Sequence, residues 1–295
     1  MRLRRTNMGW SRSPRQTDPL LTSRPHHPRR QSTMIHCVQF STGIGSAEVA
    51  VRVQDIAKDE DRLVLLTADT MVEDEDNWRF AKEVVDYLSP RWEWIIIRDG
   101  RTPMQVGRDR KVVPSDRMAV CSQILKRDAL NKWIKHNCDP ADSIIYLGFD
   151  WTEPHRHNRA EPLWLPYKID SPLMREPYIE KPALLDKYRA MGIMPPRLYS
   201  VGFSHANCGG ACVRGGQAAW KMLLDWNRPR FIEWESEEEK SRQLLSKDVA
   251  MLKETVQGKV YPLTLRRFRE RLEDQPTMFD KNDWGSCGCF MEDDQ

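Results

Sequence analysis

The sequence predicts an α/β protein with a mostly parallel, doubly wound sheet, flanking helices, and a helical and irregular C-terminal extension. Two observations support this fold class. From residue 35 onward, short runs rich in β-branched and aromatic residues alternate with amphipathic segments, which is typical of β-α units. The chain of 295 residues is also long enough to bury one large core or two modest ones.

The first half of this body predicts strands and helices in alternation. Strands are expected at residues 35–40, 63–68, 92–97 and 143–149, and helices at residues 46–58, 76–88 and 119–136. The last of these helices carries Leu125, Leu130 and Ile134 among other apolar residues at helical spacing. Asp74, Glu75 and Asp76 open the second helix, where carboxylates cap the first turn and offset the helix dipole.

The second half is expected to be less regular. Eight prolines between residues 152 and 200 predict irregular excursions with one short helix near residues 183–190. Further helices are expected at residues 214–226 and 237–256, the second because acidic residues fill its first turn. Residues 265–272 form a basic helix, for which a solvated face is favoured over contact with nucleic acid; its arginines are Arg266, Arg267, Arg269 and Arg271.

Residues 1–33 form a basic N-terminal tail. They contain eight arginines and a single acidic residue, and they lack an apolar period, so they predict a disordered segment. Met34 stands directly before the first strand and is a candidate native start of translation. The alternatives for the tail are a targeting role or a role in nucleic-acid binding.

Composition excludes several classes of protein. The net charge is only +3 and the excess of arginine lies in the tail, so the body is not expected to be a general nucleic-acid binder. No run approaches the ~20 apolar residues that span a bilayer, so no membrane partner is expected. No apolar run follows the basic start, as a secretory signal would require, so a cytoplasmic location is expected.

A candidate phosphate-binding loop follows the first strand. The segment Ser41-Thr42-Gly43-Ile44-Gly45-Ser46 runs straight into the predicted helix, which places backbone N–H groups where the helix dipole favours an anion. The loop lacks the Gly-Lys-Ser/Thr ending of a Walker A motif, and its glycine spacing differs from the dinucleotide fingerprint. An ordinary tight turn is the alternative interpretation.

This loop and several later segments resemble the PP-loop superfamily, which includes the phosphoadenosine phosphosulfate (PAPS) reductases and the ATP pyrophosphatases. Residues 40–47 are similar to the Ser-Gly-Gly-x-Asp-Ser loop of that family, with Thr42 at its first glycine and Gly45 at its acidic position. Asp69-Thr70 is similar to the Asp-Thr pair that closes the second strand near the adenosine. Further similar segments lie at residues 121–126, 147–159 and 202–212, and the last of these looks close to phage-encoded members.

The resemblance implies a PP-loop nucleotide-binding domain at residues 34–226 and a helical region at residues 227–295 that ends in a Cys-x-Cys tail. It implies an adenine nucleotide as the small-molecule ligand, either PAPS, adenosine phosphosulfate (APS) or ATP, with magnesium if ATP is used. Ligands of open α/β sheets lie at the carboxyl ends of the strands, and arginine can clamp phosphate with two hydrogen bonds. The implied nucleotide-binding residues are Ser41, Thr42, Gly43, Gly45, Ser46, Asp69, Thr70, Lys126, Arg156 and Arg159.

The seven cysteines raise the question of a metal site, because a chain without a secretory signal is not expected to build a disulfide framework. Cys208 and Cys212, together with Cys121 and either Cys287 or Cys289, make a candidate four-thiolate site. Some sulfonucleotide reductases and sulfur-transfer enzymes of the superfamily carry a four-iron cluster, so an iron–sulfur cluster is favoured over zinc or no metal. Cys37 and Cys138 are expected to be ordinary buried thiols, and His205 is an alternative metal ligand.

The resemblance also gives the tail a catalytic alternative. Cys287 or Cys289 would act as the nucleophile that attacks the sulfonate sulfur of the nucleotide, and a thioredoxin-like partner would resolve the thiosulfonate adduct. The leading hypothesis is therefore a PAPS reductase-like enzyme. The alternatives are an ATP-dependent enzyme that transfers sulfur to a nucleic acid, and a nucleotide-binding module without turnover, which the glycine at position 45 makes credible.

Overall fold

A computed structural model describes residues 33–285. Residues 1–32 of the predicted tail lie outside the described residues, and so do Cys287 and Cys289.

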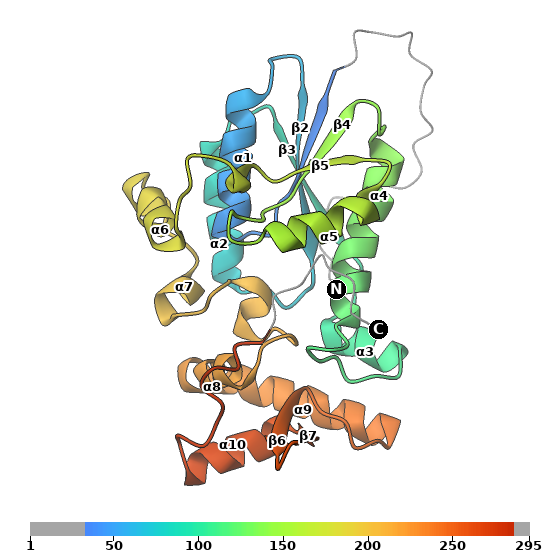
Figure 1. Ribbon diagram of the computed structural model, residues 1–295, viewed down its shortest axis with the longest axis vertical. Coiled ribbons are helices and arrows are strands. Elements are labelled where there is room, and N and C mark those ends of the chain that lie inside the picture. Colours follow the sequence, from blue (N-terminus) through green and yellow to red (C-terminus); the bar gives the residue numbers. More distant parts are fainter. Residues whose placement is uncertain (1–32, 286–295) are drawn as a thin grey trace, which may run out of the picture. The chain divides into compact units, whose positions relative to one another are not determined.

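A five-stranded parallel sheet forms the framework of the fold (Figure 1). The central strand β1 (Ile35–Gln39) pairs with β2 on one side and with β4 on the other, so the direction of winding reverses at β1. The sheet confirms the predicted α/β class. In spatial order its strands are β3 (Trp92–Arg98), β2 (Arg62–Asp69), β1, β4 (Ser143–Tyr146) and β5 (Lys168–Asp170).

Helices cover both faces of this sheet (Figure 1). On one face, α1 (Ile44–Ile56) and α2 (Glu75–Tyr87) pack through residues such as Ala47 and Phe80. On the other face, α4 (Ala129–Asn137) and α5 (Pro154–Trp164) pack through Leu130 and Ala160. The central strands are buried on both faces, which explains their nearly continuous apolar runs.

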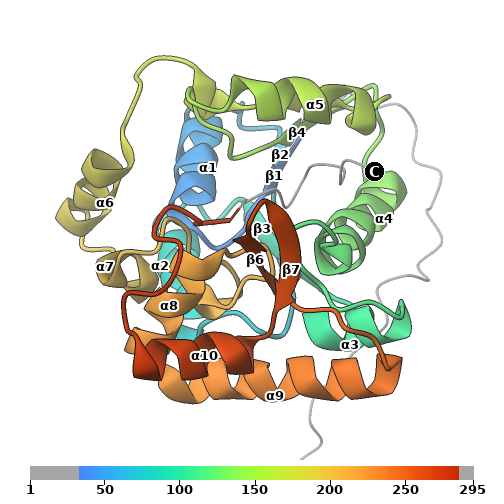
Figure 2. The ribbon, with the colours of Figure 1, turned by 60° about the horizontal axis from the view of Figure 1, so that its bottom comes forward.

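A third apolar cluster holds the C-terminal region together. The helices and strands of this region gather beside α3 in Figure 2. The aromatic centre of the cluster includes Trp220, whose ring packs edge-on against Phe231 and Trp234. Helices α8 and α9, which lie on either side of the boundary expected after residue 226, both contribute to this cluster. That domain boundary stays a prediction. The contributing elements are α3 (Pro103–Asp109), α8 (Gln217–Trp226), α9 (Arg228–Leu245), β6 (Leu252–Val256), β7 (Lys259–Leu263) and α10 (Leu265–Asp274).

The helix predicted at residues 237–256 is wrong in its second half. Helix α9 ends at Leu245, where Ser246 adopts a left-handed backbone with φ of 50°. Residues 252–256 instead form β6, which pairs with β7 in an antiparallel hairpin. The turn of this hairpin is Gln257-Gly258, and both residues have positive φ, as two-residue hairpin turns require.

The stretch at residues 152–200 is more regular than predicted. Besides α6 (Lys181–Ala190), which matches the expected short helix, it contains α5, β5 and α7 (Arg197–Val201). Pro154 stands in the first turn of α5, where the missing N–H has no cost, so a proline-rich segment can still begin a helix. The helix expected at residues 119–136 consists of a π-helical segment, Ser122–Asp128, followed by α4.

The start of α2 bears out the predicted cap. The carboxylate of Asp74 accepts a hydrogen bond of 2.9 Å from the backbone N–H of Asp76. Glu75 and Asp76 fill the first turn, where they offset the helix dipole.

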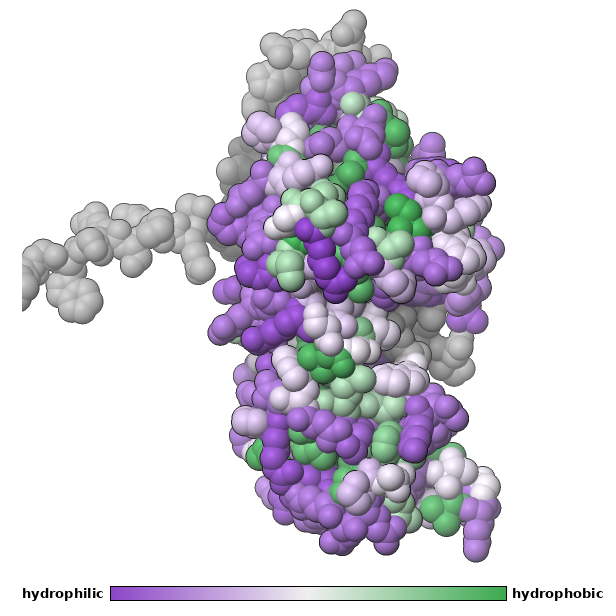
Figure 3. All heavy atoms as spheres, turned by 90° about the vertical axis from the view of Figure 1, so that its left-hand side faces the viewer, coloured by the Kyte–Doolittle hydropathy of each residue, from purple (hydrophilic) through white to green (hydrophobic). Residues whose placement is uncertain are grey.

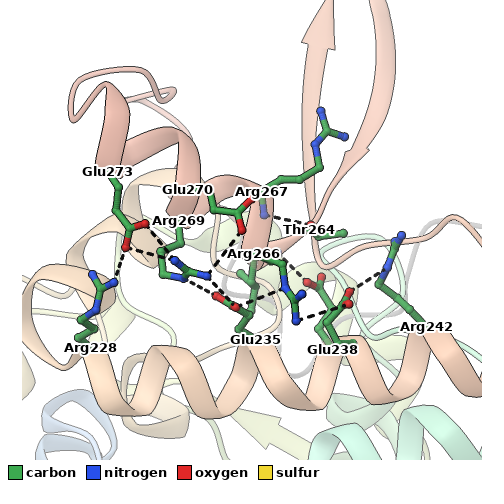
Figure 4. A network of polar contacts seen from close by, with 12 residues as sticks. Arg228, Glu235, Glu238, Arg242, Thr264, Arg266, Arg267, Arg269, Glu270 and Glu273 are labelled. Carbon is green, nitrogen blue, oxygen red and sulfur yellow. Dashed lines mark hydrogen bonds and ion pairs between the residues drawn. The ribbon is translucent and has the colours of Figure 1, made fainter.

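The basic helix expected at residues 265–272 is α10, and its arginines form ion pairs within the chain (Figure 4). Arg269 contacts Glu235 of α9 through two nitrogens, at 2.7 and 3.0 Å. Arg267 and Arg271 both pair with Glu254 of β6. These contacts favour a structural use of the charges over contact with nucleic acid.

Among residues 33–285, none of the helices has both the length and the apolar character to cross a membrane. Figure 3 shows one face of the molecule, on which apolar residues are scattered between hydrophilic ones.

Candidate functional site

A pocket with a volume of about 330 Å³ opens at the carboxyl edge of the sheet. Its walls include the residues that follow β1 and β4, the two strands between which the winding reverses. This is where open α/β sheets bind their ligands, and the volume suits a small molecule. A separate segment at residues 204–207 supplies a further wall.

The 41–46 loop forms one side of this pocket, and all six of its residues line it. The Ser46 hydroxyl ties the loop together, because it donates to the carbonyl of Gly43 at 2.9 Å and accepts from the N–H of Ser41 at 3.1 Å. Helix α1 begins inside this segment, at Ile44; its N-cap residue Gly43 has no side chain to cap it, and its first turn holds no acidic residue. This helix terminus therefore suits an anion, as predicted for a phosphate.

Thr42 is the strained residue of the loop. Its φ is 59°, a left-handed conformation that is costly for a β-branched side chain, by about 1–3 kcal/mol. Its buried hydroxyl has no hydrogen-bond partner among residues 33–285. Glycine adopts this left-handed conformation without strain.

Two of the three predicted cationic residues line the pocket. Lys126 comes from the π-helical segment, and its ammonium lies 3.8 Å from the carboxylate of Glu73. The Arg156 guanidinium lies over the Phe149 ring, 4.6 Å from the ring centre, and pairs with Glu153. Arg159 is exposed and does not line the pocket.

The predicted residues Asp69 and Thr70 are buried beside the pocket and do not line it. The carboxylate of Asp69 binds the guanidinium of Arg98 on the neighbouring strand β3 and accepts from the N–H of Met71 at 2.7 Å. The Thr70 hydroxyl donates to Glu73 at 3.0 Å. These contacts hold the turn after β2, and a direct role in nucleotide binding stays a prediction.

Several lining residues were missed by sequence reasoning. Gln39 could have been identified from the sequence, because it is a polar residue at the end of an apolar strand that is mostly buried. Tyr199 accepts at 3.3 Å from the N–H of Ile44, and nothing in the sequence pairs these distant positions. The missed lining residues include Gln39, Glu73, Trp78, Lys181, Tyr199 and Asn207.

The described cysteines are buried. Cys121, Cys208 and Cys212 are each less than a tenth exposed, and Cys208 adopts a left-handed φ of 54°. Within residues 33–285, no group of three or more His, Cys, Asp or Glu side chains is arranged to hold a metal. The remaining predicted ligands, Cys287 and Cys289, lie outside the described residues, so the metal site stays a prediction.

Cys37 and Cys138 are buried together beneath α4, as expected of core thiols. A hydrogen bond to Cys138 and burial raise the pKa of Cys37 well above its usual value. The same hydrogen bond lowers the pKa of Cys138.

No family model matches the chain, and no curated protein matches it. Two solved structures that are similar to it are enzymes. The phosphoadenylyl-sulfate (PAPS) reductase from Candida auris, in a phosphate complex, is 9% identical over 59% of this chain and 80% of that chain, with a TM-score of 0.39. The NH3-dependent NAD synthetase from Campylobacter jejuni, in complex with nitrate, is 14% identical over 74% of this chain and 86% of that chain, with a TM-score of 0.32.

Proposed function

We propose that the pocket binds an adenine nucleotide through its phosphates and that the protein is an enzyme acting on that nucleotide. One observation carries the proposal: the start of α1, whose N-cap residue supplies no side-chain cap, opens into a pocket whose walls hold buried polar atoms without partners among the described residues. These atoms are the Thr42 hydroxyl, Arg156 Nε and both amide atoms of Gln39. Each such atom costs about 1–3 kcal/mol, a cost that hydrogen bonds to a bound ligand would offset.

Among the described residues, four cationic and four acidic side chains line the pocket: Arg52, Lys126, Arg156 and Lys181, and Glu48, Glu73, Asp150 and Glu153. Arg52 is engaged elsewhere, because its guanidinium donates to the carbonyls of Pro172, Arg175 and Pro177. Lys181 donates to the carbonyl of Ser204. Lys126 and Arg156 line the pocket with the 41–46 loop, and each is paired with a carboxylate that also lines it. A phosphate group would bind between these two cations and the start of α1, where it gains charge-assisted hydrogen bonds.

Titration calorimetry on the full chain tests this function. ATP, APS and PAPS are expected to bind with at least tenfold higher affinity than adenosine, which lacks the phosphates. Equal affinity for adenosine, or no binding of any nucleotide with or without magnesium, would overturn the proposal. Product analysis then separates the alternatives: pyrophosphate from ATP indicates adenylation, the first step of the sulfur-transfer alternative, sulfite from a sulfonucleotide indicates reduction, and binding without product indicates a module without turnover.

We further propose that the cysteines serve sulfur chemistry at this site, either as ligands of an iron–sulfur cluster or zinc, or with a tail thiol as nucleophile. Cys208 follows Asn207, which lines the pocket, and Cys121 packs in the cluster that contains Ala211, the neighbour of Cys212. The last described residues lie against the segment that follows Cys212, because Asp283 accepts hydrogen bonds from the backbone N–H groups of Gln217 and Ala218.

Replacement of the tail cysteines separates these two roles. In Cys287→Ser and Cys289→Ser, loss of bound metal with loss of the ~400 nm band would identify a ligand of an iron–sulfur cluster, and retained metal with lost turnover would identify the nucleophile. Cys138→Ser is the matched control, since Cys138 packs beneath α4 with Cys37, outside the proposed set. Unchanged metal content and unchanged turnover in both tail variants would contradict the proposal.

A further inference from the structure

The side-chain amide of Gln39 is unusual among the residues of the pocket. Gln39 ends β1 and is only 3% exposed, and neither its Nε2 nor its Oε1 atom has a hydrogen-bond partner among residues 33–285. A primary amide carries two donors and an acceptor, so this side chain leaves a full set of hydrogen bonds unmade. Buried side-chain amides normally find partners, and an unpaired one calls for an explanation.

Apolar side chains from one face of the sheet line the pocket beside Gln39, and the Arg156 guanidinium covers one of them, Phe149. Cys37, two residues earlier on the strand, packs into the cluster beneath α4 and α5, and strand alternation places Gln39 on the same face. Leu66, Leu130 and Phe149 of that cluster line the pocket with it. Methionine or leucine would suit these neighbours and avoid the cost of an unpaired amide, so stability does not explain glutamine here.

We propose that Gln39 is the specificity-determining residue for the base of the nucleotide, an inference that rests on the proposed function. Its amide would form two hydrogen bonds with the edge of adenine, accepting from the 6-amino group and donating to the neighbouring ring nitrogen. The flat ring would lie among the apolar side chains of the pocket. Gln39 precedes Ser41 of the 41–46 loop by two residues, so the end of β1 would contact both the base and the phosphates of the nucleotide.

The test compares ATP with purine riboside triphosphate, which lacks the 6-amino group but keeps the ring, ribose and phosphates. The unmodified protein is expected to bind ATP about tenfold or more tightly, because the analogue leaves the buried amide oxygen of Gln39 without a hydrogen-bond donor. Gln39→Met is expected to bind the two triphosphates with affinities within about threefold of each other. Its thermal midpoint should equal or exceed that of the unmodified protein, since an orphaned amide is removed. Gln39→Leu is a second variant of the same kind.

The outcomes separate this inference from the proposed function. Gln123→Met is the control, because Gln123 is exposed and does not line the pocket, and it should keep the preference for ATP. A folded Gln39→Met or Gln39→Leu that keeps the preference, or that loses both triphosphates equally, would overturn the role of Gln39. Failure of the unmodified protein to bind either triphosphate would instead overturn nucleotide binding itself.

Discussion

Replacement of Arg156 by methionine is expected to lower the affinity for ATP and PAPS by about 10- to 100-fold, and to leave the weaker affinity for adenosine nearly unchanged. A charge-assisted hydrogen bond to phosphate contributes about 1.5–3 kcal/mol, and methionine cannot make one. The apolar stem of methionine still covers the Phe149 ring, over which the guanidinium now lies. The variant therefore removes the charge with little change in packing.

The matched control for this experiment is Arg159→Met. Arg159 lies on the same helix as Arg156 and carries the same charge, but it is exposed and does not line the pocket. Calorimetry with ATP, PAPS and adenosine should show loss of affinity only in Arg156→Met. Equal losses of affinity in the two variants would mean that the effect comes from general surface charge. Unchanged affinity in Arg156→Met would mean that Arg156 does not bind the phosphate.

The different positions of Arg156 and Arg159 were not predicted from the sequence. Both were expected in a polar loop, because the prolines around them argued against a helix. The segment is helix α5, and its inward side repeats every four residues with Arg156, Ala160 and Trp164. That spacing was visible in the sequence and could have identified the helix and the inward-facing arginine.

Asp69 shows a limit of a different kind. Its side chain is engaged by Arg98, and these two residues are register partners in β2 and β3. A sequence motif places Asp69 at the end of a strand, but it does not say which residue of the next strand stands beside it. Strands β1 to β4, the loop after β1 and the start of α1 follow from local patterns and were predictable. Pairings between distant residues, including Tyr199 with α1, depend on the assembled fold.

Glu238 is the residue of the C-terminal region whose replacement is expected to affect stability most. It lies on α9 and is fully buried (Figure 4). Its two carboxyl oxygens accept hydrogen bonds of 2.7 Å from the N–H of Met251, just before β6, and of Leu265, which begins α10. One side chain therefore joins three elements. In Glu238→Gln the amide NH₂ would face one of these N–H donors, at a cost of about 1–3 kcal/mol.

This cost is expected to depend on pH. Burial raises the pKa of Glu238 from 4.5 to about 7, against the opposing effect of the two backbone N–H groups. The folded chain therefore holds the proton more tightly than the unfolded chain does. The resulting contribution to the free energy of unfolding is complete below pH 4.5 and is lost as the pH rises through 7, by about 3 kcal/mol in all.

Urea denaturation of the full chain at pH 5.5 and pH 8 measures this effect. Glutamine cannot titrate, so the stability advantage of the unmodified protein over Glu238→Gln should be largest at pH 5.5 and should shrink by pH 8. Glu233→Gln is the control, because Glu233 is an exposed residue of the same helix, and this variant should follow the unmodified protein at both pH values. An advantage that is constant between the two pH values would mean that Glu238 keeps one protonation state in the folded protein, with its carboxylate held by the two N–H donors.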